Sequence, residues 1–133
     1  MTEKIWKILM VDDEPSALKD PKILLENIIR ASGRNNFHID TAESGDIALK
    51  KINEKNGYDL IITDYKMPVD GVCLYKNLNP EQQKKVVFCT GKTGEVRERL
   101  DLELKETDFK TPEIIHRVDI LFKYDEIVQN YLS

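Results

Sequence analysis

Short runs of β-branched and aromatic residues alternate along the chain with segments whose apolar residues recur at helical spacing. The runs predict strands at 4–11, 37–42, 59–63, 85–90 and 118–123. Apolar residues three and four positions apart predict helices around 18–29, 47–52, 74–78 and 127–132. Strand and helix therefore alternate from one end of the chain to the other.

This alternation predicts an α/β fold in which a doubly wound, five-stranded parallel sheet carries helices on both faces. Central strands of such a sheet are buried on both sides and are therefore continuously apolar, as 8–11 and 60–62 are. The segment 91–117 is an elongated connection between the fourth and fifth strands. It contains a charged helix around 94–105, and Thr111-Pro112-Glu113 predicts the start of a short extra helix.

Size and composition favour one soluble domain over 1–133. The chain has 133 residues, of which 41% are apolar and 33% charged, and a net charge of -4 leaves no basic patch for nucleic acid. We found no apolar run long enough to cross a membrane and no signal peptide, so we expect a cytoplasmic location. Cys73 and Cys89 have no metal-binding spacing, which favours buried free thiols.

Polar residues follow the predicted strands where each one ends. Asp12 and Asp13 follow the first strand, Asp64 the third, Thr90 ends the fourth, and Lys123 ends the fifth. In open parallel sheets, functional groups collect in the crevice outside the carboxyl ends of the strands. We therefore expect these side chains to lie together at one rim of the sheet.

Three carboxylates at one rim repel one another unless a cation neutralises them, and oxygen ligands of this kind suit Mg²⁺. Each residue alone also has an ordinary structural interpretation. Asp13 can favour a helix start, Asp64 can sit in a turn, Thr90 can cap a helix and Lys123 can be solvated. The conjunction at separate strand ends, in this chain order, favours a functional site.

With these residues the sequence resembles the receiver domain of bacterial two-component response regulators. The resemblance covers nearly the whole chain and rests on "ILMVDDEP", "TAESGDIAL" and "LIITDYKMPVDG", with "VVFCTGK" and "ILFKY" as weaker matches. It implies a flavodoxin-like strand order, 2-1-3-4-5. It also implies a cytoplasmic signalling domain whose chemistry is limited to its own phosphorylation and dephosphorylation.

The resemblance implies a role for each rim residue. Asp64 would accept a phosphoryl group from a sensor histidine kinase or a phosphotransfer protein, while Mg²⁺ is held by Asp12, Asp13, Asp64 and the backbone carbonyl of Lys66. Thr90 would hydrogen-bond the phosphoryl group and Lys123 would pair with it. A carboxylate is one of the side chains that form covalent phosphoryl intermediates. The output would be an unidentified protein or domain, with no direct contact to nucleic acid or membrane.

The sequence departs from the family pattern in ways that affect the switch. Tyr124 follows Lys123 where the family usually has proline, and Ile120 stands where an aromatic residue usually reorients on phosphorylation. We therefore expect the switch to act through 91–117, whose start contains Gly91 and Gly94.

Two enzyme classes that share parts of this pattern do not fit the sequence. The "TGKT" segment lacks the first glycine of a nucleotide-binding P-loop, because position 86 is valine. A phosphatase of the haloacid dehalogenase type would need a second acid two residues after Asp64, where this chain has Lys66. The main alternative is a degenerate receiver that acts as a phosphorylation-independent protein-interaction module.

Overall fold

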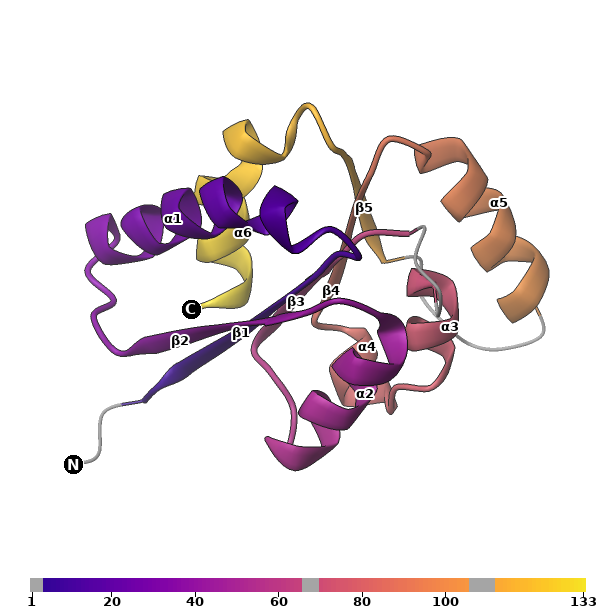
Figure 1. Cartoon of the computed structure of the whole chain (residues 1–133), viewed down its shortest axis with the longest axis horizontal. Helices are drawn as coiled ribbons and strands as arrows, with labels where there is room; N and C mark the ends of the chain where they lie inside the picture. The colour runs from indigo at the N-terminus through magenta and orange to yellow at the C-terminus, as the bar shows by residue number, and fades with distance from the viewer. Residues whose placement is uncertain (1–3, 66–69, 106–111) are drawn as a thin grey trace.

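A computed structural model describes residues 4–65, 70–105 and 112–133 of the chain (Figure 1). The elements are β1 (Trp6–Val11), α1 (Pro15–Ala31), β2 (Phe37–Ala42), α2 (Gly45–Glu54), β3 (Leu60–Thr63), α3 (Gly71–Lys76), α4 (Pro80–Gln83), β4 (Val86–Thr90), α5 (Thr93–Leu104), β5 (Glu113–His116) and α6 (Ile120–Tyr131). In this part of the chain, no helix combines the length and the apolar character needed to cross a membrane.

The strands form one parallel sheet in the order β2-β1-β3-β4-β5, which confirms the predicted fold and strand order. β1 pairs with β3 in a register that sets Ile8 opposite Leu60 and Val11 opposite Thr63. β4 pairs with β5 so that Thr90 lies opposite His116. The carboxyl ends of β1, β3, β4 and β5 therefore meet along one rim of the sheet.

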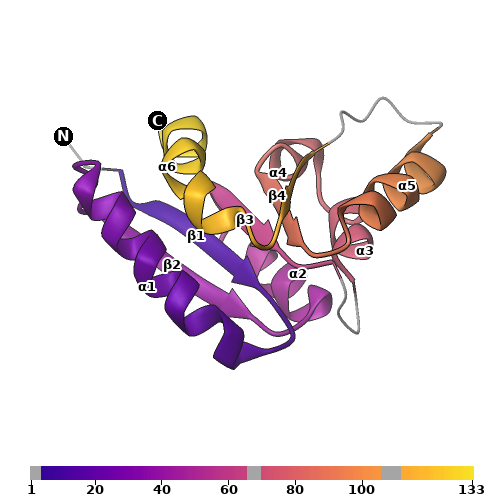
Figure 2. The same ribbon diagram turned by 90° about the horizontal axis from the view of Figure 1, so that it is seen from above.

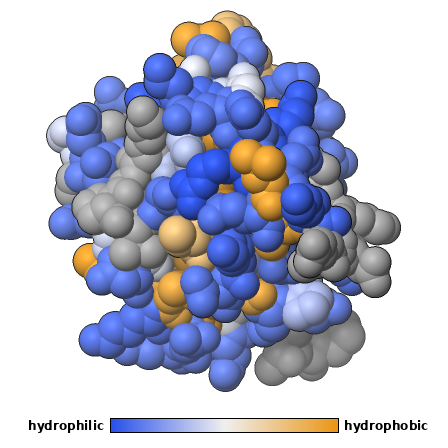
Figure 3. All heavy atoms as spheres, turned by 90° about the vertical axis from the view of Figure 1, so that its right-hand side faces the viewer, coloured by the Kyte–Doolittle hydropathy of each residue, from blue (hydrophilic) through white to orange (hydrophobic). Residues whose placement is uncertain are grey.

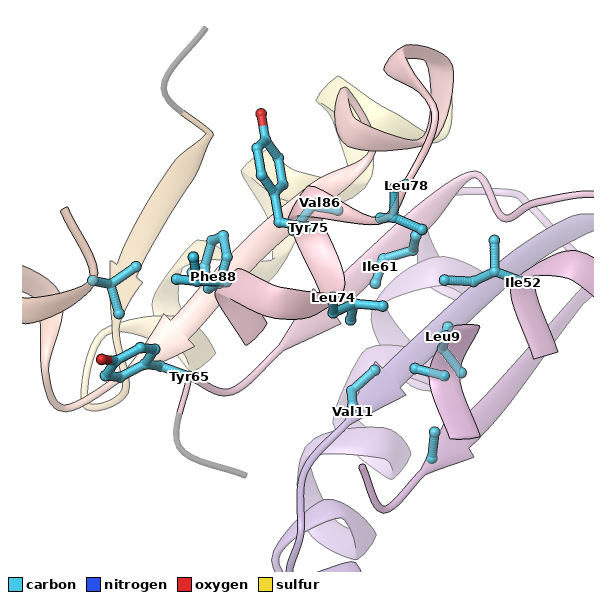
Figure 4. Close-up of a cluster of buried hydrophobic side chains, with 14 of the residues drawn as sticks. Leu9, Val11, Ile52, Ile61, Tyr65, Leu74, Tyr75, Leu78, Val86 and Phe88 are labelled. Carbon is cyan, nitrogen blue, oxygen red and sulfur yellow. The ribbon is translucent and has the colours of Figure 1, made fainter. Parts of the chain in front are cut away.

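Helices cover both faces of the sheet, with α1 and α6 on one face and α2, α3 and α5 on the other (Figure 2). The strand side chains alternate between the two faces, so Ile8 and Met10 pack under α1 and α6 while Leu9 and Val11 pack on the other side. Figure 4 shows this second cluster, in which Tyr75 of α3 packs against Phe88 with ring centroids 6.2 Å apart. Burial on both faces explains the continuously apolar central strands.

Several helices begin where the sequence provides a capping side chain. Ser44 accepts a hydrogen bond from the Ile47 N–H and Asp70 accepts one from the Cys73 N–H, which satisfies first-turn donors of α2 and α3. Gly71 opens α3 against the segment that follows β3. A Cβ atom at this position would lie 2.6 Å from the Asp64 carbonyl oxygen and 2.7 Å from the Phe88 ring, so only glycine allows this close approach.

The predicted fifth strand was wrong. The structure has β5 at Glu113–His116, whereas 118–123 forms a turn and the first residues of α6. A short apolar run does not distinguish strand from helix. The buried residues Ile120, Tyr124, Ile127 and Val128 follow helical spacing, which extends the predicted last helix back to Ile120.

The same error affects the predicted extra helix at 111–113. Glu113 begins β5 instead of a helix, and Thr111 lies outside the described residues. The charged helix predicted at 94–105 is present as α5, Thr93–Leu104.

Candidate functional site

Asp64 is held at the rim by the backbone of the sheet. β3 ends at Thr63, and the Asp64 N–H donates to the Val11 carbonyl at 2.9 Å, which continues the pairing of β3 with β1 for one more residue. Its side chain is only 8% exposed. One carboxylate oxygen, Oδ1, accepts a hydrogen bond from the Tyr65 N–H at 2.7 Å. This nearly buried carboxylate therefore has a fixed orientation, and its other oxygen, Oδ2, faces the rim, where Arg117 contacts it.

Asp12 and Asp13 follow β1 and lie next to Asp64. The Asp12 N–H donates to the Ala42 carbonyl at 3.0 Å, and Asp12 Oδ1 accepts from the Glu14 N–H at 2.9 Å. Carboxylate oxygens of the three aspartates lie within 4.8 Å of one another. Sequence reasoning predicted this convergence, and the geometry suits a hard divalent cation with oxygen ligands.

The charge of the cluster is only partly compensated. Partial burial raises the pKa of the Asp12 carboxyl, against the lowering effect of the Glu14 N–H, and the negative charge of Asp64 raises it further. Asp64 in turn raises the pKa of the Arg117 guanidinium, so this side chain stays charged. Three carboxylates thus face one guanidinium, and the remaining negative charge favours a bound cation.

Arg117, which the sequence analysis did not select, provides the cation at this rim. It directly follows β5, and its Nη2 atom lies 2.9 Å from Asp64 Oδ2. Its backbone N–H donates to the Thr90 carbonyl at 3.0 Å, so the pairing of β5 with β4 continues past His116 and fixes the position of Arg117. The run "EIIH" immediately before Arg117 was the signal for this residue, because paired isoleucines are typical of a strand.

Lys123 lies elsewhere. It is in α6, its side chain is 49% exposed, and its ammonium group pairs with Glu126 at 3.6 Å. The prediction that Lys123 ends a strand was therefore wrong, because it followed from the misassigned run 118–123. Ile120 likewise lies in α6, at its first residue, and not in the fifth strand where it was predicted.

Thr90 ends β4 as predicted and is 2% exposed. Its hydroxyl oxygen accepts a hydrogen bond from the Lys92 N–H at 3.0 Å, just before α5 begins. The side chain thus connects the rim to the start of α5. Lys66, whose carbonyl was predicted to bind the metal, lies outside the described residues.

A second group of polar contacts joins α5 to the residues around Asp64. Arg99 of α5 forms ion pairs with Asp70 and with Glu103, and its guanidinium lies over the Tyr65 ring, 5.6 Å from the centroid. Burial raises the pKa of Asp70, but the Cys73 N–H and Arg99 together outweigh this effect and lower it. Tyr65 directly follows Asp64, so this group links the rim to the middle of α5.

A family model and two characterised relatives match most of this chain. The model of the response regulator receiver domain matches residues 8–111. The transcriptional regulatory protein ResD of Bacillus subtilis is 32% identical over 123 residues, which are 88% of this chain and 48% of ResD. The alkaline phosphatase synthesis transcriptional regulatory protein PhoP of the same organism is 35% identical over 131 residues, covering 91% of this chain and 50% of PhoP. The chain therefore spans about half the length of these relatives.

Solved structures agree on the fold. A response regulator receiver domain protein of Clostridium thermocellum matches with a TM-score of 0.65 and 26% identity, over 95% of this chain and 96% of that one. The chemotaxis protein CheY4 of Vibrio cholerae matches with a TM-score of 0.70 at 21% identity, over 96% of this chain and 99% of that one, and supports the fold alone. Because the family model covers most of the chain, this protein belongs to the response regulator receiver domain family and has the phosphoacceptor signalling function of two-component systems.

Proposed function

We propose that Asp64 is the phosphoacceptor, that Asp12, Asp13 and Asp64 hold Mg²⁺, and that Arg117 and Thr90 bind the phosphoryl group. The observation that carries this proposal is the convergence of three carboxylates and one guanidinium at the ends of β1, β3 and β5. The backbone carbonyl of Lys66 remains a proposed fourth metal ligand. The phosphodonor is a histidine of a sensor kinase or of a phosphotransfer protein, the partners that two-component systems use.

The transfer needs positioning and charge neutralisation more than covalent chemistry by other residues. An oxygen of Asp64 forms a bond to phosphorus while the bond from phosphorus to the donor's histidine nitrogen breaks, and the nitrogen keeps the electron pair. When bound, Mg²⁺ supplies positive charge to the phosphoryl oxygens. The hydrogen bond from the Tyr65 N–H holds the Asp64 carboxylate in orientation throughout.

Arg117 has a distinct part in this proposal. In the unphosphorylated domain its guanidinium pairs with Asp64, and after transfer the same group pairs with phosphoryl oxygens. A guanidinium offers a planar fork of donors that matches phosphate geometry, whereas the lysine expected from the resemblance offers a single point charge. Since the Arg117 side chain is 59% exposed, it has room to follow the added group.

The switch is proposed to begin at Thr90. Its hydroxyl accepts from the Lys92 N–H in the unphosphorylated state, and turning to donate to a phosphoryl oxygen would release that contact at the start of α5. The Arg99 contacts would carry the change along the helix, because they join α5 to Tyr65 and Asp70. The face around α5 is mainly hydrophilic with apolar side chains in small patches (Figure 3), so a partner there would be recognised largely by charge.

Labelling with acetyl phosphate, with and without Mg²⁺, tests the acceptor site. We expect Mg²⁺-dependent incorporation that is mapped to Asp64 and is lost in Asp64→Asn, while the exposed control Asp101→Asn is labelled like the native protein. Incorporation that persists in Asp64→Asn would contradict the assignment. Complete failure of labelling would favour the interaction-module alternative, which no observation on the described residues supports.

A further inference from the structure

A cavity of about 100 Å³ lies beside the acidic rim, between the sheet and the helices α1 and α6. These two helices lie side by side on one face of the sheet (Figure 2). The cavity walls are mostly apolar side chains, from Met10, Leu18, Pro21, Ile62, Ile120 and Tyr124. Asp12, Asp64 and Arg117 also line it, so one end of the cavity is polar and belongs to the rim described above.

Tyr124 brings a hydroxyl group to this largely apolar space. Its side chain is 1% exposed, yet its hydroxyl makes no hydrogen bond to any residue in the described part of the chain. In that same part of the chain, every side-chain oxygen that is fully buried has a hydrogen-bond partner. The Tyr124 oxygen therefore keeps some exposed surface, and the cavity is the open space that its residue lines.

An unpaired polar group inside a protein is costly, and such groups normally have a partner in the protein, in water or in a ligand. Cys89 also lines the cavity, and burial raises the pKa of its thiol to about 11, so it stays uncharged. A thiol is a weak donor and a weak acceptor. Apart from Asp12, Asp64 and Arg117, the lining thus combines apolar side chains with one good hydrogen-bonding group and carries no charge.

Size and lining define the occupant. An engineered apolar cavity of about 150 Å³ in another protein binds benzene. By that scale, a cavity of about 100 Å³ with an open end takes a neutral molecule of roughly four or five heavy atoms. We infer that this cavity is a binding site for a small neutral organic molecule, whose apolar body packs against Leu18, Ile62 and Ile120 and whose hydroxyl or carbonyl group bonds the Tyr124 hydroxyl.

This site is distinct from the phosphoacceptor chemistry and does not depend on it. The cavity shares Asp64 and Arg117 with the rim, so an occupant would lie directly against the ion pair that we propose to rearrange on phosphorylation. The inference is tested on the unphosphorylated, metal-free protein. Its failure would therefore leave the proposed function untouched, and failure of phosphorylation would leave this inference untouched.

The test uses isobutanol and xenon as probes, followed by NMR on methyl-labelled protein. Isobutanol has a branched apolar body and one hydroxyl, whereas xenon is apolar only. We expect both probes to shift the Ile62, Ile120 and Leu18 methyl signals in a saturable manner, with isobutanol binding in the millimolar range. Absence of saturable shifts at these methyl groups for both probes would overturn the inference.

Three variants identify the binding groups. Tyr124→Phe keeps the ring and should weaken isobutanol binding about three- to tenfold, the effect of one hydrogen bond, without weakening xenon binding. Leu18→Phe places a larger side chain in the cavity wall, which fills the space, and should remove the binding of both probes. The control Tyr131→Phe removes a hydroxyl of the same helix that bonds Glu113 instead, and should change neither. Undiminished isobutanol binding in Tyr124→Phe and Leu18→Phe would overturn the assignment of the site.

Discussion

The guanidinium of Arg117 lies 2.9 Å from the Asp64 carboxylate, and this ion pair joins the ends of β5 and β3. Asp64 is nearly buried, whereas Arg117 is more than half exposed. A carboxylate at that depth needs a partner, because removing charge from water is costly. The pair therefore identifies Arg117 as the counter-ion of the acidic rim.

Replacing Arg117 should destabilise the metal-free protein more than replacing Lys123. We expect Arg117→Ala to lose about 1 kcal/mol in urea unfolding, a value discounted for the exposure of the side chain. Mg²⁺ should recover part of that loss, because it would supply the missing positive charge. Lys123→Ala removes an exposed lysine of α6 and should stay within about 0.5 kcal/mol of the native protein. Equal losses in the two variants would contradict the counter-ion role.

Arg117 should also affect phosphorylation. With acetyl phosphate and Mg²⁺, we expect Arg117→Ala to be labelled more slowly than Arg117→Lys, which keeps the charge but loses the planar fork of donors. Lys123→Ala should be labelled at the native rate. A slow Lys123→Ala together with an unaffected Arg117→Ala would restore the original prediction for Lys123.

Mg²⁺ affinity should depend on Asp13, whose side chain is exposed and whose replacement should leave the fold intact. Asp13→Asn should lower the affinity roughly tenfold or more, since the metal loses a charged oxygen ligand. Isothermal titration calorimetry is the appropriate measurement. Trp6 fluorescence is unsuitable because Trp6 begins β1, about 20 Å from the site at the usual strand rise. The exposed control Asp101→Asn should bind Mg²⁺ with native affinity.

The raised pKa of Asp12 leads to a pH-dependent stability difference. A carboxyl whose pKa is higher in the folded state than in the unfolded state binds its proton more tightly when folded, so its charged form destabilises the fold. Without metal, Asp12→Asn should therefore be more stable than the native protein at neutral pH. The difference should shrink as pH falls through the folded-state pKa of Asp12 towards its ordinary value of 3.8. A difference that grows on acidification would contradict this sign.

Arg99 should hold α5 against the rest of the domain. Arg99→Met removes the contacts to Asp70, Glu103 and Tyr65, and should raise the rate of amide hydrogen exchange along Thr93–Leu104. The exposed neighbour Arg97 provides a matched control on the same helix.

If the switch acts through α5, the phosphoryl mimic beryllofluoride should change hydrogen exchange at 91–105 in the native protein and in Arg97→Met. The change should be smaller in Arg99→Met. A response confined to the residues around Asp64 would eliminate this route.

Replacing Gly71 and Gly94 with alanine should change the stability of the domain in opposite directions. Gly71→Ala places a methyl group against the Asp64 carbonyl and Phe88, and should cost about 2 kcal/mol or more. Gly94 lies in the first turn of α5, with open space around it and no left-handed φ, so Gly94→Ala should stabilise the domain by up to about 1 kcal/mol. Gly94 therefore needs no special backbone freedom, contrary to the expectation from its sequence position. Urea unfolding of both variants measures the contrast.

The sequence predicted those parts of the fold that follow from local pattern. Strand β2 was predicted at its observed bounds, and the acids after β1 and β3 were identified because each follows an apolar run that ends abruptly. The end of the chain was harder to predict because two apolar runs, 113–116 and 118–123, compete for the last position in the sheet. The run that pairs with β4 becomes the strand. This pairing joins residues far apart in the sequence, so local pattern does not predict it. Arg117 was missed for this reason.

The hydrogen bond from the Arg117 N–H to the Thr90 carbonyl has a consequence for comparing relatives of this protein. It ties the basic residue to the hydroxyl residue through the register of two neighbouring strands, whatever the length of chain between them. Insertions or deletions between β4 and β5 would therefore leave the two side chains facing the same acid. An alignment that takes the apolar run 118–123 as the fifth strand will select a lysine on the surface of α6. An alignment anchored on the strand that pairs with β4 will select the arginine that contacts Asp64.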